Sequence, residues 1–167
     1  LSGYPYSCPD MIGGGQITDF RGPTEKLDHE LFARYCEASA LMPMMQYSLN
    51  IWDLGNPETR RICREMSALH AKYGDYIIAC AKAASQTGAP MVRAMEYAYP
   101  HCGYGGITDQ YLLGDRILVA PVLKKGQRRR KVRIPTGKWQ LGDKIYSNET
   151  VTLPCPVDTL LYFERID

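Results

Sequence analysis

Residues 116–123 read Arg-Ile-Leu-Val-Ala-Pro-Val-Leu, a strongly β-prone run in this 167-residue chain. Aliphatic and β-branched residues without helical spacing favour a buried strand. Beyond this run, Gly, Pro and Asn turns separate four further short segments with strand character, at residues 131–134, 138–141, 149–153 and 160–166. Short strands at such spacing are typical of an all-β fold. We predict a small antiparallel β-sandwich over residues 116–167.

Upstream of residue 116 the pattern alternates between strand and helix. Short apolar segments at Gly3–Pro9 and Met44–Ser48 are expected to be buried strands. A helix is expected over Leu27–Met42, where Pro43 ends it, with the apolar face Leu31, Tyr35, Ala38 and Met42. One long helix is expected from Pro57 to the residues before Gly88.

The order strand, helix, strand, helix indicates parallel βα units, so the predicted fold class is α/β plus all-β. Two such units cannot close a barrel. We therefore predict an incomplete α/β domain over residues 1–115 and a β-sandwich domain over residues 116–167, with the boundary near Arg116.

The stretch Ser-Cys-Pro-Asp-Met-Ile-Gly-Gly-Gly, residues 7–15, carries the first candidate site. Asp10 would stand at a strand end beside Gly13, Gly14 and Gly15, whose backbone can turn with positive φ or approach a ligand closely. The same carboxylate could instead order the turn by accepting a hydrogen bond from a nearby backbone N–H. At the end of the second strand the sequence offers Gln46, Ser48, Asn50 and Trp52.

Composition and charge exclude several classes of function. The net charge is only +2, and the basic run between Lys124 and Arg133 holds Gly126 between two β-rich segments. We therefore favour a solvated hairpin turn there over a polyanion-binding patch, and we expect no nucleic-acid partner. No apolar run approaches the roughly 20 residues that a membrane span requires.

Metal and cofactor motifs are missing from the sequence. The six cysteines contain no C-x-x-C pair, and the three histidines lack zinc-site spacing. Gly13–Gly15 lacks both the G-K-[ST] and the G-x-G-x-x-G context of a phosphate-binding loop. We expect no metal and no cofactor. Asn148-Glu149-Thr150 is a formal glycosylation sequon, and nothing in the sequence fixes the compartment.

Five segments, in order, resemble glycoside hydrolase family 31. Residues 109–123 are similar to its D-Q-F-x-x-G-x-x-L-L-V-A-P-V pattern, and residues 134–139 to the L-P-x-G-x-W that follows. Gly88–Arg93 is similar to its G-x-P-x-x-R, Pro9–Gly14 to its D-I-G-G segment, and Arg34–Pro43 to its R-W-x-Q-x-x-x-x-x-P. The resemblance spans nearly the whole chain.

This resemblance implies a retaining α-glycosidase with a (β/α)8 barrel, whose last βα units this chain would supply, followed by a β-sandwich. Members use two aspartates, a nucleophile and an acid/base, which lie upstream of the D-I-G-G segment. We therefore expect both before Leu1 and no catalytic residue here. The partners implied are an α-linked sugar substrate and the missing N-terminal part of the barrel. Asp10, Gln46 and Ser48 would bind the substrate at the strand ends.

Two departures from the family pattern bear on specificity. Gly14 stands in a segment where many members have an aromatic residue, and Ser48 stands where many have a sugar-binding histidine. Residues 43–48 instead resemble the P-x-M-Q-F-S of a subgroup similar to myogenesis-regulating glycosidase and bacterial α-galactosidases. The expected substrate is an α-galactoside or α-glucoside. A non-catalytic glycan-binding or regulatory relative of the same fold is the alternative.

Overall fold

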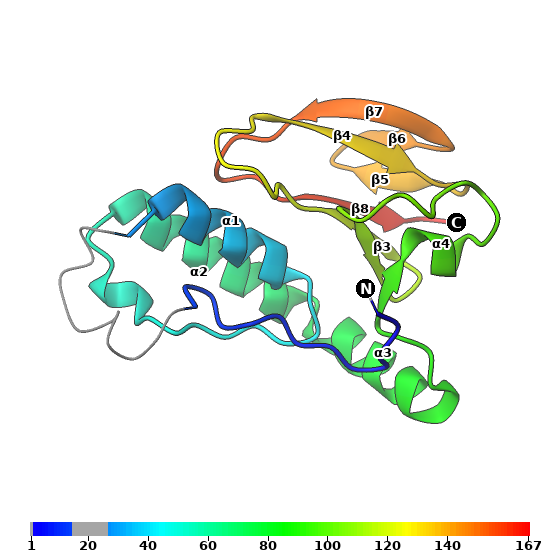
Figure 1. Ribbon diagram of the computed structural model, residues 1–167, viewed down its shortest axis with the longest axis horizontal. Helices are drawn as coiled ribbons and strands as arrows, with labels where there is room; N and C mark the ends of the chain where they lie inside the picture. Colours follow the sequence, from blue (N-terminus) through cyan, green and yellow to red (C-terminus); the bar gives the residue numbers. More distant parts are fainter. Residues whose placement is uncertain (1, 15–26) are drawn as a thin grey trace.

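The computed structural model describes residues 2–14 and 27–167. Figure 1 shows helices α1, α2 and α3 below and to the side of a group of strands that contains all eight β-strands of the described residues. In chain order, the elements are α1 (His29–Ala40), η3 (Ile51–Asp53), α2 (Pro57–Lys72), α3 (Gly74–Thr87), β1 (Val92–Ala94), α4 (Met95–Ala98), β2 (Tyr111–Leu113), β3 (Ile117–Ala120), β4 (Arg129–Ile134), β5 (Trp139–Leu141), β6 (Lys144–Tyr146), β7 (Glu149–Pro154) and β8 (Leu161–Arg165).

The strands form two antiparallel sheets. The larger has the order β1-β2-β3-β8-β5-β6, and the smaller pairs β4 with β7. Leu118 and Phe163 of the larger sheet share a buried core with Val132 and Ile134 of the smaller one, together with Trp139. The antiparallel sheet domain expected from the sequence is therefore present.

The larger sheet lies between the small sheet and the helices. Alternate residues of β2 and β3 point to opposite faces, as they do in any strand. Leu112 and Leu118 enter the core of the sandwich, whereas Leu113 and Val119 pack into a second core that α1, α2 and α3 also line. Both faces of these two strands are buried, which explains their continuous apolar sequence.

The sheet takes in strands on both sides of Arg116. β1 pairs with β2 from Val92↔Leu113 onward, and β2 pairs with β3. The buried Gln110 then reaches across to β4: its Nε2 donates to Arg133 O at 2.7 Å, and its Oε1 accepts from Arg133 N at 3.0 Å. The division into 1–115 and 116–167 stays a prediction.

The two strands expected at the N-terminal end are not regular strands. Gly3–Pro9 carries no strand, and the segment Met44–Ser48 contributes one isolated bridge, Ile12↔Tyr47. Pro5 and Pro9 lack the N–H that a sheet ladder needs, which is a local reason for the first error. The bridge is parallel, so the relative direction of the two segments agrees with the prediction.

Helix α1 begins as the sequence indicates, but it buries a different face. Asp28 caps it by accepting a hydrogen bond from Leu31 N at 3.0 Å. The expected inward residue Leu31 is 61% exposed, and the core instead receives Phe32, Ala33, Cys36 and Ala40. Both sets have helical spacing, so only the neighbouring elements decide between them.

The expected long helix is two helices. α2 ends at Lys72 and α3 begins at Gly74, with Tyr73 at φ −95° and ψ 9° between them. Glycine is a poor residue for a helix interior, and the Tyr73 hydroxyl donates to the Glu164 carboxylate of β8 at 2.5 Å. Gly88, at φ 72°, ends α3 as expected.

The basic segment after β3 is not a hairpin turn, because β3 and β4 belong to different sheets. Its cations contact the start of α1. Lys125 Nζ lies 2.5 Å from Asp28 Oδ2, and Arg128 Nη1 lies 2.5 Å from Glu30 Oε1. The segment therefore attaches the sandwich to the helices.

Candidate functional site at the parallel bridge

Two segments 35 residues apart meet where Ile12 pairs with Tyr47. Ile12 N donates to Gln46 O at 2.9 Å, and Ser48 N donates to Ile12 O at 3.0 Å. Figure 1 shows both segments running in the same direction, toward the end at which η3 lies. Residues that follow Ile12 and residues that follow Tyr47 therefore emerge at one end of the pair.

A glycine turn closes the first segment. Gly14 N donates to Met11 O at 2.8 Å, and Gly13 and Gly14 have φ of 103° and 53°. A Cβ on Gly13 would lie 2.6 Å from Ser48 Oγ and 3.0 Å from Phe32 Cε2. Glycine is therefore required by both the backbone conformation and the close approach of Ser48. Gly15 lies outside the described residues.

The three predicted site residues, Asp10, Gln46 and Ser48, lie near this end and differ in exposure and hydrogen bonding. Asp10 is exposed, and its Oδ1 accepts from Met11 N at 2.8 Å, so the carboxylate does order its own turn. Ser48 Oγ donates to Ile12 O at 2.9 Å, and Gln46 is exposed. Within residues 2–14 and 27–167, no hydrogen bond joins Asp10 to Gln46 or Ser48. Their role toward a ligand stays a prediction.

The paired segments have one covered face and one open face. Ile12 is fully buried against the helices. The Tyr47 hydroxyl donates to Cys63 O at 3.1 Å and lies 2.9 Å from Ser67 Oγ, both on α2. On the other side Met11, Met44 and Gln46 are exposed. The open face therefore presents the side-chain amide of Gln46 and the thioethers of Met11 and Met44.

Trp52, on η3, is the residue that sequence reasoning placed at this end without giving it a role. Its side chain is 63% exposed. Asn50 fixes its turn: Oδ1 accepts from Trp52 N at 3.2 Å, and Nδ2 donates to Asp53 Oδ2 at 2.9 Å. The sequence signal that could have singled out Trp52 is its position just beyond the polar residues at the end of the expected strand. Its exposure, which is uncommon for a tryptophan, is visible only in the structure.

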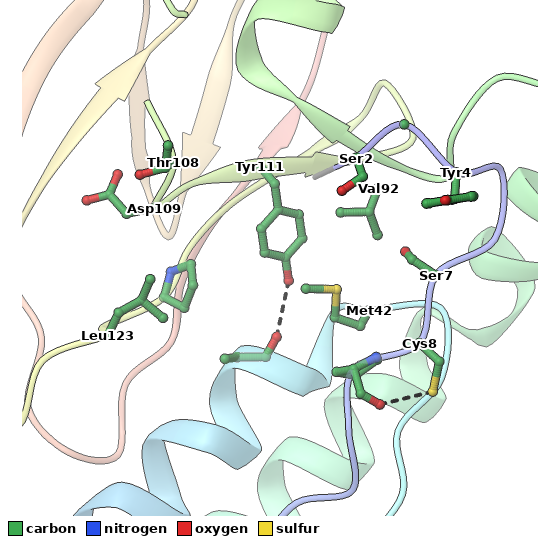
Figure 2. A pocket seen from close by; sticks show the side chains of 14 residues that line it. Ser2, Tyr4, Ser7, Cys8, Met42, Val92, Thr108, Asp109, Tyr111 and Leu123 are labelled. Atoms are coloured by element: carbon green, nitrogen blue, oxygen red, sulfur yellow. Dashed lines mark hydrogen bonds between the residues drawn. The ribbon is translucent and has the colours of Figure 1, made fainter. Parts of the chain in front are cut away.

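A cavity of about 350 Å³ lies elsewhere, along the chain before Asp10. Figure 2 shows Ser7 and Cys8 of this chain on one side and Tyr111 and Asp109 on the other. Three of its polar side chains have partners: Tyr111 Oη donates to Ala38 O at 3.3 Å, Cys8 Sγ donates to Pro9 O at 3.0 Å, and Asp109 pairs with Arg130 at 3.0 Å. None of the predicted site residues, Asp10, Gln46 and Ser48, lines this cavity.

Arg34, a residue of the R-W-x-Q-like segment, holds α1 to the sandwich rather than contacting the bridge. Its Nη2 donates to Cys155 O at 2.7 Å and to Gln127 O at 3.2 Å, and its Nη1 pairs with Glu37 at 2.8 Å. Burial raises the pKa of Glu37 to about 7, although the Arg34 guanidinium opposes that shift. Glu37 Oε1 is buried without a partner among the described residues, which fits a carboxyl that is easily protonated.

Two absences characterise residues 2–14 and 27–167. No group of three or more His, Cys, Asp or Glu side chains is arranged to hold a metal ion there. None of the helices found there has both the length and the apolar character needed to cross a bilayer.

Comparison with known proteins identifies the family. Residues 88–165 match the Glycosyl hydrolase family 31 C-terminal domain. The chain is 34% identical over 176 residues to mouse myogenesis-regulating glycosidase, covering 98% of this chain and 24% of that protein. It is 32% identical to the isomaltosyltransferase of Sporosarcina globispora, over 99% of this chain and 16% of that protein. A third relative, the SITS-binding protein of Tetronarce californica, is 28% identical over 94% of this chain and 23% of its own length.

Solved structures agree with this grouping. The GH31 dextranase of Flavobacterium johnsoniae complexed with glucose superposes with a TM-score of 0.81 at 26% identity, over 93% of this chain and 20% of that one. A GH31 α-xylosidase from a soil metagenome, complexed with xylose, gives the same TM-score and identity and is covered to 27%. The chain thus spans about a quarter or less of the length of these relatives. From its sequence motifs, its antiparallel sheet domain and these matches, the chain belongs to glycoside hydrolase family 31.

Proposed function

We propose that this chain is part of a retaining α-glycosidase, in which it supplies the last two βα units of a (β/α)8 barrel and the β-sandwich that follows. The observation that carries the proposal is the Ile12↔Tyr47 parallel bridge. One face of this pair is covered by helices while the other, with Met11, Met44 and Gln46, is open, as expected for barrel strands without their barrel. The superposition of 93% of the chain on one fifth of a dextranase supports it.

In this proposal the strand ends bind sugar and the catalytic pair comes from the part of the protein before Leu1. Retaining glycosidases need two carboxyl groups about 5 Å apart, one ionised and one protonated. Asp10 uses Oδ1 for its own turn, and its other oxygen would accept hydrogen bonds from sugar hydroxyls. Gln46 would offer its side-chain amide on the open face, and Ser48 would offer its hydroxyl oxygen at the end of the pair.

The proposed sugar is an α-galactoside, with an α-glucoside as the second possibility. An imidazole can donate and accept hydrogen bonds on its two nitrogens, and Ser48 has only one hydroxyl. Its proton is directed to Ile12 O, so the oxygen is left mainly as an acceptor. This pocket would therefore contact the sugar differently from one with histidine. Relatives named for isomaltose and dextran favour the glucoside, so the sugar needs direct assay.

A second function has one specific observation in its favour. The relative named SITS-binding protein is named for binding, and it matches 94% of this chain. A non-catalytic glycan-binding or regulatory protein of the same fold would keep Asp10 and lose turnover. Assay of the full-length protein distinguishes the two.

The test uses the full-length protein and a panel of aryl α-glycosides. We expect turnover of the α-galactoside with release of the α-anomer first, detected by NMR, because two displacements retain configuration. Asp10→Asn should lower kcat/KM by about tenfold to a hundredfold, since a charged hydrogen-bond acceptor is lost. Asp143→Asn, an exposed turn residue of the sandwich, is the matched control. Hydrolysis of only α-glucosides would overturn the galactoside assignment, and turnover of none would leave the binding function.

A further inference from the structure

We propose that Trp52 forms an additional sugar-binding subsite, a stacking surface for the sugar on the leaving-group side of the bond that is cleaved. This inference rests on the proposed function. It starts from an unusual feature: one of the two tryptophans of the chain is fully buried, and the other, Trp52, is 63% exposed. An exposed indole offers a large, flat apolar surface on which a ligand can stack.

The position of Trp52 suits a subsite at the rim. It lies on η3, five residues beyond Tyr47, on the segment that continues from the parallel pair past Ser48. Asp10, Gln46 and Ser48 lie within two residues of the bridge and would contact the sugar whose bond is broken. A residue farther along the same segment is left to contact the next sugar outward.

The backbone of Trp52 is held in place. Asn50 caps the short turn through Trp52 N and Asp53, and Asp53 N donates to Asn50 O at 3.1 Å. The backbone that carries the indole is therefore ordered before a ligand binds, which lowers the backbone entropy lost on binding. The apolar C–H face of a pyranose can stack on such a ring, and the contact discriminates little between sugars because it uses no hydroxyl pattern.

The chemistry of the partner follows from this placement. The ligand class is an α-linked disaccharide or oligosaccharide, in preference to a glycoside with a small leaving group. A purely structural Trp52, packed against another part of the protein, would affect all substrates alike. The two interpretations differ in the ratio of effects on large and small leaving groups.

The experiment compares two substrates of one sugar in the full-length protein: melibiose and α-galactosyl fluoride, or isomaltose and α-glucosyl fluoride if glucosides are preferred. Trp52→Ala should raise the ratio of KM for the disaccharide to KM for the fluoride by about tenfold, the size of one aromatic contact. Trp52→Phe should keep that ratio within about threefold. Tyr97→Ala, another exposed aromatic residue on α4, is the control and should leave the ratio unchanged.

Equal changes in both KM values after Trp52→Ala would overturn the subsite. A full-length protein that hydrolyses no glycoside would refute the proposed function, and the subsite would then be tested by calorimetry with the same disaccharide and its parent monosaccharide. A Kd ratio that is identical in the wild type and Trp52→Ala would overturn it there too.

Discussion

The sandwich and the Ile12↔Tyr47 pair are both built from apolar, strand-forming sequence, yet they differ in how completely they are paired. β2 and β3 have hydrogen-bonded neighbours on both edges and cores on both faces. The N-terminal pair has one bridge and one covered face. Backbone N–H and C=O groups need partners, so a strand is stable only within a sheet that completes it. Apolar sequence alone therefore does not make a strand.

The largest expected effect separates the two tryptophans. Trp139 is fully buried between the sheets, and its Nε1 donates to Thr136 O at 3.2 Å. Trp139→Ala should lower the free energy of unfolding by about 3–5 kcal/mol, whereas Trp52→Ala should lower it by less than about 0.5 kcal/mol. Urea denaturation of the purified protein, followed by circular dichroism, measures both. Similar losses for the two variants would contradict the contrast between a closed sandwich and an open pair.

The next effect concerns the link between the two regions. Arg34→Ala leaves Glu37 and the carbonyls of Gln127 and Cys155 buried without their donor, and should cost about 3 kcal/mol of unfolding free energy. The double variant Arg34→Met, Glu37→Leu removes both charges and should cost less than the single variant. If the double variant were as unstable as Arg34→Ala, the loss in Arg34→Ala would not come from leaving the Glu37 carboxylate buried without a partner.

A smaller effect depends on pH. Burial raises the pKa of Glu37 from 4.5 to about 7, so the folded protein holds this proton more tightly than the unfolded chain. The protonated Glu37 carboxyl therefore stabilises the folded state, fully so below pH 4.5. This contribution to the free energy of unfolding is lost as the pH rises toward 7, and the loss is at most about 1–3 kcal/mol. Glu37→Gln should flatten this part of the stability profile relative to the wild type. An unchanged slope in Glu37→Gln would assign the titration to another group.

The smallest effect is expected at the surface of the same junction. Lys125 pairs with Asp28; the lysine side chain is exposed to solvent and the aspartate side chain is partly exposed. Solvent screening weakens such pairs, so Lys125→Ala should leave the urea midpoint unchanged within error, with or without added salt. A clear, salt-dependent loss would show that the junction relies on its surface charges as well as on Arg34.

Sequence patterns predicted the elements that depend on local chemistry. The β-prone segments separated by Gly, Pro and Asn turns predicted the strands of the sandwich, and Gly88 marked the end of α3. The structure adds that Val132 and Ile134 point inward and that Asp28 caps α1. The family resemblance, confirmed by the comparisons, also rested on local motifs.

Features set by distant contacts were missed. The break at Tyr73 lies inside an apolar stripe that continues across it, and its partner Glu164 is 91 residues away. The predicted inward face of α1 contained Leu31, whereas the structure buries Phe32. The basic run near Lys125 was predicted to be a hairpin turn, because nothing local in the sequence reveals that its partners are Asp28 and Glu30 at the start of α1. At the candidate site, the sequence located Asp10, Gln46 and Ser48, but not the open face or the exposure of Trp52.

Helix α1 contacts both the glycine turn and the sandwich. Phe32 lies against the position that a Cβ of Gly13 would occupy, and two residues later Arg34 is hydrogen-bonded to Cys155 of the sandwich. A rotation of the sandwich would thus tilt the helix and displace the glycine turn, although no sandwich residue touches that turn through the contacts described. In the proposed glycosidase, the sandwich would therefore support the sugar-binding end of the strand pair through α1.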